Sequence, residues 1–450
     1  MFIPPGTYNI DEVNVPANSI IFGMGDSSII KRRTPSIAQI CVFNLTGGNI
    51  SMHSFKIDGN GSTGEWNAGL ILCYGVYSNM RFENITFEAG AAWAFKLAGV
   101  SQIIIRGCRV VNTTSGGFWI TSEGLAVDIS DVFISDNYID RSMITADSSS
   151  NHGILARGSD NGVKKLQRCV ISNNIIKQHI SGGICIEAWA SSTSISGNTT
   201  EGGYMGISTA NCEDISVSGN TIKKPVYTGI ELTVSGHQAI CSGNIVEGDG
   251  FTGAGIIQSA PGQGCDETNI VGNTITGVNE EGIFLSGTIR SNVSGNYVRL
   301  NPASPTSLGI GIRFQAIGRG AALASITVSG NYLCGMQTGN TSAINLENHT
   351  SSGDPNVSLA ITGNTMINWI YGVILYASGI VIRGTVVGND IDNINQTLGL
   401  FADAGGTHEL ARTGNRGDIP TITGAKSGNA ALTSLITALA TQGLIVNSTT

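Results

Sequence analysis

The sequence is short of charged residues. Asp, Glu, Lys and Arg make up 12% of its 450 residues, about half of the usual share of roughly 25%. The formal net charge is −8, and basic runs such as Lys31–Arg33 are brief. A surface that neutralises phosphate groups needs many more clustered cations than this. We therefore expect no nucleic acid among the partners of this protein.

Long apolar runs are missing as well. No run reaches the roughly 18 residues of a membrane span, so the sequence predicts no membrane insertion. The start of the chain, Met1–Gly6, has no basic region followed by an apolar one. The sequence therefore predicts no signal peptide in this chain.

Cysteine motifs are also absent. The nine Cys residues are scattered, with no C-x-x-C pair and no Cys/His cluster at zinc spacing. We interpret them as small apolar residues that pack in a reducing compartment, with a disulfide or metal role as the less favoured alternative. We expect neither a metal ion nor an organic cofactor.

Glycine, in contrast, is abundant: 61 residues are about twice the usual share of roughly 7%. Many belong to a recurring Gly-Asn motif, seen first at Ile195–Asn198. Gly and Asn accept the left-handed backbone angles of a sharp corner, and one Asn per repeat can stack into a hydrogen-bonded ladder. The Asn residues of the motif are Asn198, Asn220, Asn244, Asn273, Asn296, Asn331, Asn364, Asn389 and Asn415, preceded by the degenerate members Asn84, Asn137 and Asn174.

A short segment recurs between these corners and begins with a small residue. Its second residue is apolar in every copy, and its fourth is apolar in nearly every copy. Period-two alternation places residues two and four inside and residues three and five outside. The copies begin at Gly69, Ala94, Gly117, Gly153, Gly183, Gly206, Gly229, Gly255, Gly282, Gly311, Ala343, Gly372 and Gly399.

Strands that recur in one direction, with no helical pattern between them, stack as parallel sheets. The sequence therefore predicts an all-β chain that folds over residues 1–415 as a right-handed parallel β-helix, a solenoid. Residues 416–450 are expected to form a tail. Within it, apolar residues at three- and four-residue spacing over 429–445 predict a short C-terminal helix. This helix either caps the open core or forms a contact between subunits.

Two turns near the start carry a family resemblance. Phe2–Tyr8 contains Pro-Gly-Thr-Tyr, and Ile20–Gly25 contains Gly-x-Gly. With the repeats, they make the chain resemble bacteriophage tailspikes and capsule depolymerases of the pectin-lyase-like β-helix family, over roughly residues 1–415. The resemblance implies a homotrimer, on a virion tail or outside the cell, that binds and cleaves a bacterial surface polysaccharide. The sequence departs from the phage pattern because no particle-binding domain precedes the first turn.

Charges on the outward positions of the repeated segment suggest a catalytic pair. Arg157 and Glu187 occupy the same outward position in successive copies, and Glu231 lies two copies beyond Glu187, one outward position across. The spacings of a parallel sheet put the Cβ atoms of the two Glu residues about 12 Å apart. Their side chains can close this gap to the roughly 6.5–9.5 Å of an inverting glycosidase pair. One Glu would be the general acid, and the other would activate water.

Several neighbours are candidates for binding the substrate. Arg157 can hold the carboxylate of an acidic sugar or tune Glu187. Aromatic rings stack on sugar faces. The candidate residues for substrate binding are Trp119, Trp189, Asp160 and Lys96. The alternative interpretation is a surface ion pair of Arg157 and Glu187 beside a solvated Glu231.

The loops offer a competing site for a lyase. A lyase needs a base near the acidic proton of the sugar and a cation that neutralises the sugar carboxylate. His152 with Arg157 fits this description. Further ionisable residues in the neighbouring turns are Glu123, Asp147, Asp160 and His179. Arg313 and Glu347 form a second charged pair on the outward positions, and we interpret it mainly as structural.

These observations favour a polysaccharide depolymerase, either a glycoside hydrolase or a polysaccharide lyase, with hydrolysis ahead of elimination. A fold alone does not fix a function. A glycan-binding adhesin or fibre shaft without catalysis is one alternative. A sugar epimerase on the same fold is another, and it would leave the length of the polysaccharide unchanged.

Overall fold

The computed structural model describes most of the chain. The described residues are 1–33, 41–61, 68–90, 93–125, 127–141, 152–159, 164–178, 181–187, 189–234, 236–251, 253–259, 265–301, 309–315, 323–336, 341–347, 356–377, 381–402, 407–411, 421–422 and 446–447. The helix expected within 429–445 lies outside them. None of the described residues forms a helix long and apolar enough to cross a membrane.

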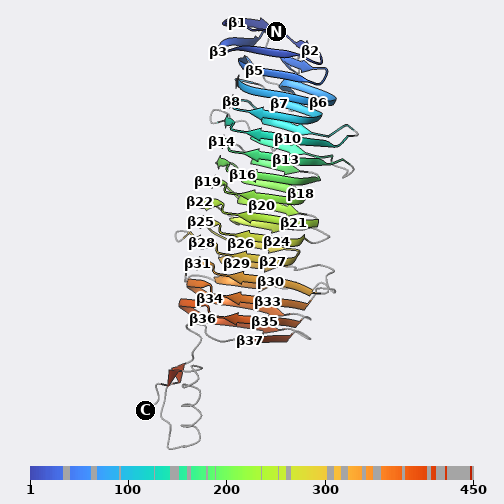
Figure 1. Cartoon of the computed structure of the whole chain (residues 1–450). Coiled ribbons are helices and arrows are strands. Elements are labelled where there is room, and N and C mark those ends of the chain that lie inside the picture. The colour runs from blue at the N-terminus through green and yellow to red at the C-terminus, as the bar shows by residue number, and fades with distance from the viewer. Residues whose placement is uncertain are drawn as a thin grey trace, which may run out of the picture.

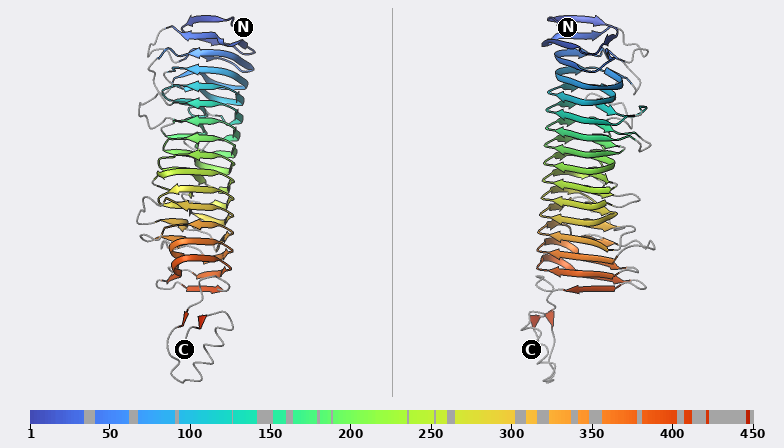
Figure 2. Two further views of the ribbon diagram at one scale, coloured as in Figure 1. Left: turned by 90° about the vertical axis from the view of Figure 1, so that its left-hand side faces the viewer. Right: turned by 45° about the vertical axis from the view of Figure 1, so that its right-hand side comes forward.

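The strands stack into a rod (Figure 1). Each turn of the chain contributes up to three strands, and every strand pair is parallel. The fold is therefore a right-handed parallel β-helix, as the repeats predicted. Figure 2 shows the same stack from two further sides, with the strands of successive turns one above another.

The strands belong to three parallel sheets that run the length of the rod. The first sheet includes β2 (Val13–Val15), β4 (Phe43–Leu45), β9 (Gly116–Thr121), β12 (Ile154–Arg157), β15 (Gly182–Glu187), β20 (Thr228–Val234), β23 (Ile256–Ser259), β26 (Glu281–Ser286), β29 (Ile310–Gln315) and β32 (Ser342–Glu347). The second includes β10 (Ile129–Ser135), β13 (Leu166–Ser172), β16 (Ala190–Ser196), β21 (Gly236–Ser242), β24 (Cys265–Val271), β27 (Thr288–Ser294), β30 (Leu323–Ser329), β33 (Asn356–Thr362), β35 (Val381–Val387) and β37 (Thr407–Ala411). The third includes β1 (Gly6–Ile10), β8 (Arg109–Val111), β11 (Tyr138–Asp140), β14 (Ile175–Lys177), β17 (Thr199–Glu201), β19 (Thr221–Lys223), β22 (Ile245–Phe251), β25 (Thr274–Val278), β28 (Tyr297–Leu300) and β31 (Tyr332–Cys334).

Some long strands continue from one sheet into another. They are β3 (Ile20–Arg32), β5 (Ile50–Asp58), β6 (Gly69–Glu88), β7 (Trp93–Arg106), β18 (Met205–Ser218), β34 (Thr365–Ala377) and β36 (Asp390–Ala402). In the tail, β38 (Thr421–Ile422) pairs with β39 (Val446–Asn447), apart from the three sheets.

A column of buried Asn side chains joins the second sheet to the third. The amide nitrogen Nδ2 of Asn198 donates to Oδ1 of Asn220 at 2.9 Å and to the carbonyl oxygen of Ile171 at 2.9 Å. The backbone N–H of Asn198 donates to the same Oδ1 at 2.9 Å. The members of this ladder are Asn137, Asn174, Asn198, Asn220, Asn244, Asn273, Asn296, Asn331, Asn364 and Asn389.

Four of the predicted Asn residues differ in their outcomes. Asn137 and Asn174 belong to the ladder, which confirms them. Asn84 does not, since it precedes the ladder position and has a positive φ of 54°. In the next coil the ladder position holds Cys108, whose N–H donates to Oδ1 of Asn137 at 2.8 Å. Asn415 lies outside the described residues.

The small residue that opens each copy of the repeat is required by the core. A Cβ atom added to Gly229 would lie 2.5 Å from the side chain of Val246 and 2.5 Å from the carbonyl oxygen of Gly255. Both distances are far below ordinary contact. A side chain at position 229 would therefore push this strand away from Val246 of the third sheet and from Gly255 of the next coil.

The expected register is wrong for the first and the last copy of the repeated segment. Gly69 pairs with Trp93 rather than with Ala94, because the buried residues of that copy are Ile71 and Cys73. A slip of one residue exchanges the inward and outward faces of a strand. In the last copy, Ile374 pairs with Gly399 rather than with Phe401. The copies from Ala94 to Gly372 align as expected.

Candidate functional site

The candidate site lies on the outward side of the first sheet. Strand pairing places Cys185, Ser208 and Glu231 in one column, on successive coils. It places Arg157 and Glu187 side by side in the next column. Glu231 is therefore two coils from Cys185 and one outward step from the column of Glu187. This is the arrangement that the repeat predicted.

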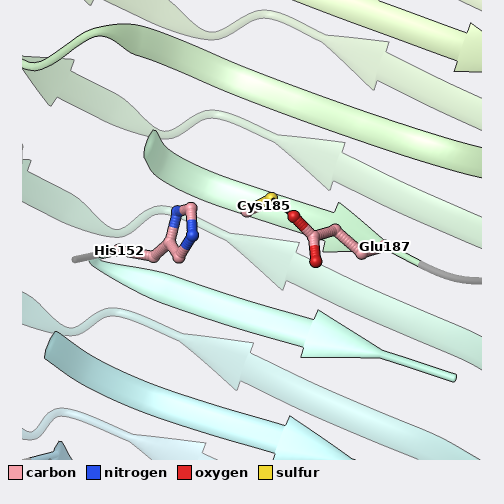
Figure 3. Close-up of side chains that lie close together, drawn as sticks. All are labelled: His152, Cys185 and Glu187. Atoms are coloured by element: carbon pink, nitrogen blue, oxygen red, sulfur yellow. Dashed lines mark hydrogen bonds between the residues drawn. The ribbon is translucent and has the colours of Figure 1, made fainter. Parts of the chain in front are cut away.

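His152 joins this surface from the residue pair that precedes β12. Its imidazole, the Cys185 thiol and the Glu187 carboxylate each offer an atom, and these atoms all lie within 4.8 Å of one another (Figure 3). The Cys185 thiol donates to Oε1 of Glu187 at 3.1 Å. Gly182 leaves room for the imidazole, since a Cβ atom there would lie 3.0 Å from Nδ1 of His152. The chain thus brings three different ligand atoms together on two neighbouring coils.

Arg157 lies between two carboxylates. Its Nη1 is 3.6 Å from Oε2 of Glu123, and its Nε is 4.0 Å from Oε2 of Glu187. The Arg157 side chain is 18% exposed, and the two Glu side chains are more open. Arg157 and Glu187 are therefore neighbours, as predicted, and Glu123 is a second carboxylate beside Arg157.

Burial controls the protonation of His152 and Cys185. It lowers the pKa of His152, while Glu187 acts in the opposite direction. It raises the pKa of the Cys185 thiol well above its usual range, and the nearby Glu187 carboxylate raises it further. Without a bound cation, the site therefore holds a neutral imidazole and a protonated thiol.

Glu231 is a partly buried carboxyl group. Burial raises its pKa above the ordinary value, and a hydrogen bond from the Thr233 side chain opposes this effect. A carboxylic acid that keeps its proton at higher pH is suited to donate it to a leaving group. Glu231 and Glu187 thus have different surroundings, one set by burial and the other by a guanidinium.

Two exposed Tyr rings lie near Glu231, and the sequence analysis missed them. Tyr204 and Tyr227 immediately precede β18 and β20, and their rings stack 4.8 Å apart at an angle of 6°. They are 46% and 38% exposed. Burial raises the pKa of Tyr227, and the nearby Tyr204, Glu280 and Glu231 raise it further, in that order, so Tyr227 and Glu231 share one surface. The missed signal is a Tyr two residues before the repeated segment in two successive copies.

Trp119 and Lys96 have buried surroundings instead of the open face expected of them. Trp119 is 2% exposed and packs with Trp93, Leu155 and Cys185 in an apolar cluster outside the main core. The Lys96 ammonium is 4.0 Å from the centroid of the Trp119 ring, and Lys96 is 8% exposed. Outward positions are therefore not all solvent-facing, because large neighbours on adjacent coils cover one another. Neither side chain is open to a sugar ring in this arrangement.

The remaining predicted residues are placed as follows. Trp189 is partly buried, has a positive φ of 66° and lies just before β16, a strand of the second sheet. Its backbone donates to the carbonyl oxygen of Asn211 at 3.0 Å, so it marks a turn. Asp160, Asp147 and His179 lie outside the described residues.

A second charged group lies further along the same sheet. Nη1 of Arg313 is 2.7 Å from Oε1 of Glu281, and Nη2 is 2.8 Å from Oε2 of Glu347. Burial raises the pKa of Glu281, while Arg313 opposes that effect. The close pairing of Arg313 on both sides is what a structural ion pair requires. It agrees with the interpretation made from the sequence.

The fold and this surface define a class of protein: a β-helix with ionisable side chains gathered on one sheet. Residues 135–349 match a family model described as "Periplasmic copper-binding protein (NosD)". This stretch includes His152, Cys185, Glu187 and Glu231. No curated protein matches the sequence.

Solved structures that are similar to this chain come from proteins with different activities. One is PfbA, a surface adhesin of Streptococcus pneumoniae, with 15% identity, 70% of this chain and 82% of that chain covered, and a TM-score of 0.49. Another is the A-module of the mannuronan C-5 epimerase AlgE6 of Azotobacter vinelandii, with 14% identity, coverage of 92% and 90%, and a TM-score of 0.40. A third is tailspike protein 3 of bacteriophage CBA120, with 12% identity, coverage of 94% and 57%, and a TM-score of 0.39. The fold therefore rests on the strand pairing of the chain itself.

Proposed function

We propose that the chain binds an extended polysaccharide along the first sheet and cleaves its glycosidic bonds by hydrolysis. Glu231 is the general acid that protonates the leaving oxygen, and Glu187 is the base that activates water. The observation that carries this proposal is the register, which puts a partly buried Glu231 two coils and one outward step from an Arg-paired Glu187. This spacing suits an inverting pair, whose carboxyl groups are roughly 6.5–9.5 Å apart.

Two further features support a sugar polymer as the substrate. The stacked Tyr204 and Tyr227 rings offer an exposed aromatic surface beside Glu231, and aromatic faces bind sugar rings well. The rod repeats the same outward positions on every coil, so a polymer can follow the first sheet over several sugar units. A bacterial capsule or O-antigen is the substrate class that the family resemblance favours.

Elimination by His152 and Arg157 is less favoured. His152 is 8% exposed, and its Nδ1 atom is buried. A lyase base must reach a proton on the sugar ring. The homotrimer, and the location on a virion tail or outside the cell, stay predictions from the resemblance.

The test is a digest of a panel of capsular and lipopolysaccharide glycans, analysed by chain length and by the ultraviolet absorbance of unsaturated uronides. We expect shorter chains without new absorbance. We also expect Glu231→Gln and Glu187→Gln to lose about 100-fold or more of the activity. Glu201→Gln, on the third sheet, is the matched control and should keep full activity.

Each other outcome rejects part of the proposal. Shorter chains with new absorbance would identify a lyase and move the chemistry to His152 and Arg157. Binding without cleavage on the whole panel would identify an adhesin. A changed sugar composition at constant chain length would identify an epimerase.

A further inference from the structure

The group of His152, Cys185 and Glu187 has a property that polysaccharide hydrolysis does not need. Nδ1 of His152 is buried and has no hydrogen-bond partner among the described residues. A buried polar atom without a partner destabilises the folded state. The ring is close to two other side chains that can bind a cation. A nitrogen, a sulfur and an oxygen ligand atom therefore meet at one place on the rod.

The three donor atoms form a mixed nitrogen, sulfur and oxygen set. The 4.8 Å limit on their mutual distances exceeds the separation of ligands around one ion by only about 1 Å, given metal–ligand bonds of roughly 2.0–2.3 Å. Small side-chain rotations therefore close the site. Imidazole and thiolate are ligands for zinc and copper, whereas calcium and magnesium take oxygen ligands.

The surroundings favour a bound ion in two ways. Trp93, Trp119 and Leu155 pack with Cys185 and keep its thiol away from water. Gly182 leaves the space that the imidazole occupies. The apolar wall limits competition from water for the cation, and Glu187 is the ligand on the open side of the group.

We propose that His152, Cys185 and Glu187 bind a thiophilic metal ion, Zn²⁺ or Cu⁺, through one nitrogen, one sulfur and one oxygen atom. Three protein ligands leave a coordination position for water or another small ligand, as in open zinc sites. The sequence analysis did not single out this group, because its three residues do not follow a zinc-binding spacing.

Binding is a balanced exchange. The Cys185 thiol gives up its proton to the solvent, its hydrogen bond to Glu187 breaks, and bonds from the metal to sulfur, nitrogen and oxygen form. No electron is transferred. One proton is therefore released for each ion bound at this site.

The charges around the site bear on the choice of metal. Arg141 and Arg157 lower the pKa of His152, and Cys212 and Glu231 raise the pKa of Cys185, in each case after the larger effects of burial and Glu187. Glu123 pairs with Arg157. Exchange of the thiol proton for Cu⁺ leaves the total charge unchanged, whereas exchange for Zn²⁺ adds one positive charge near two guanidinium groups. The charges thus favour Cu⁺, and the Glu187 oxygen ligand favours Zn²⁺.

The metal and the sugar chemistry would compete for Glu187. A carboxylate bound to a metal does not act as a free base, so a bound ion should inhibit cleavage. This consequence rests on the proposed hydrolysis, but the metal site itself does not. Metal binding is measurable without any substrate.

The test uses the full chain. Zn²⁺ binding is followed by calorimetry in two buffers that differ in ionisation enthalpy, which also counts the released proton. Co²⁺ is used as an optical probe, because a bound thiolate gives a ligand-to-metal charge-transfer band. Cu⁺ affinity is measured without oxygen by competition with a chromophoric chelator. We expect one equivalent of ion, one proton released and the charge-transfer band.

Variants assign the ion to the site. Cys185→Ser, His152→Gln and Glu187→Gln should each weaken binding about tenfold or more, and Cys185→Ser should abolish the band. Cys212→Ser, which changes another buried Cys of the core, should keep both. If Cys185→Ser does not fold, Glu187→Gln at the more open end of the group still tests the site.

The outcomes separate the two proposals. Binding by the parent chain that all three variants retain, or no binding of either ion, overturns the metal site and leaves hydrolysis intact. Metal binding without polysaccharide cleavage in the metal-free chain overturns the hydrolase and leaves the metal site. A Cu⁺ affinity far above that for Zn²⁺, or the reverse, identifies the ion.

Discussion

The ammonium group of Lys96 lies over the face of the Trp119 ring, 4.0 Å from its centroid. Both residues are buried, and burial lowers the pKa of Lys96 to about 8. The attraction of a cation to an aromatic face offsets part of the cost of holding the charge there. The pair is therefore a structural contact on the outward side of the first sheet.

A pH-dependent effect on stability follows from this pair. The unfolded Lys binds its proton with a pKa near 10.4, so between about pH 8 and pH 10.4 the unfolded chain binds more protons than the folded one. Lys96 therefore makes the folded state more stable as the pH rises through that range. Lys96→Met removes this dependence. The melting temperature of Lys96→Met relative to the parent should be higher at pH 7 than at pH 10.

The exposed Lys223 supplies the control for Lys96. Lys223→Met should change the melting temperature equally at both pH values. If the difference in melting temperature between Lys96→Met and the parent does not vary with pH, the Lys96 ammonium is not buried. Binding of polysaccharide should be unaffected by Lys96→Met, because Lys96 is not at the surface.

The Asn ladder should dominate the stability of individual coils. Asn220→Ala removes the acceptor of the Asn198 amide and the donor to Asn244. Buried groups then lose their partners, and we expect a loss of about 3 kcal/mol in the free energy of unfolding. Asn44 makes a similar bond to Asn14 at the surface. Asn44→Ala should cost less than about 0.5 kcal/mol.

Chemical denaturation of both Asn variants checks this prediction. Equal shifts of the two unfolding midpoints would contradict it. The side-chain amides would then contribute no more inside the rod than they do in water.

The pH profile of cleavage reports on Glu231. A general acid must carry its proton, so kcat/KM should fall as the pH rises through the pKa of Glu231, which burial raises. The hydrogen bond from Thr233 lowers that pKa. Thr233→Val should therefore raise the pKa and move the alkaline limb of the profile to higher pH. An alkaline limb that stays in place would remove Glu231 from the acid role.

The two stacked Tyr pairs provide a matched comparison for substrate binding. Tyr227→Ala should weaken polysaccharide binding by about fivefold to tenfold, because it removes half of the aromatic surface beside Glu231. Tyr297 and Tyr332 stack in the same way, 5.1 Å apart at 5°, but on the third sheet. Tyr332→Ala should leave binding unchanged. Equal losses in the two variants, measured by affinity electrophoresis, would place the polymer elsewhere.

Much of this architecture could be predicted from the sequence, because the features that define it repeat. The Asn of each corner indicated the ladder, and the apolar positions gave the inward face and the register of the middle coils. That register is enough to place Arg157 next to Glu187 and Glu231 two coils beyond. These relationships depend only on counting positions along identical coils.

Other features could not be predicted, because they depend on side chains in different positions of neighbouring coils. His152 reaches Cys185 only because Gly182 carries no side chain, and no spacing rule links the two. The burial of Trp119 depends on the size of Trp93 in the coil before it. Tyr204 and Tyr227 lie two residues before the start of their copies, outside the positions that repeat. The end copies slipped in register because their buried residues shift by one or more positions.

The ladder described above has a consequence for how such a chain can change its length. Successive Asn members are separated by as few as 22 and as many as 37 residues, yet their hydrogen bonds keep nearly the same length. The number of residues between successive ladder positions can therefore vary without a break in the ladder. A coil can thus accept residues inserted between its strands. New binding surfaces can be introduced through such insertions, one coil at a time, while the spacing between the coils stays the same.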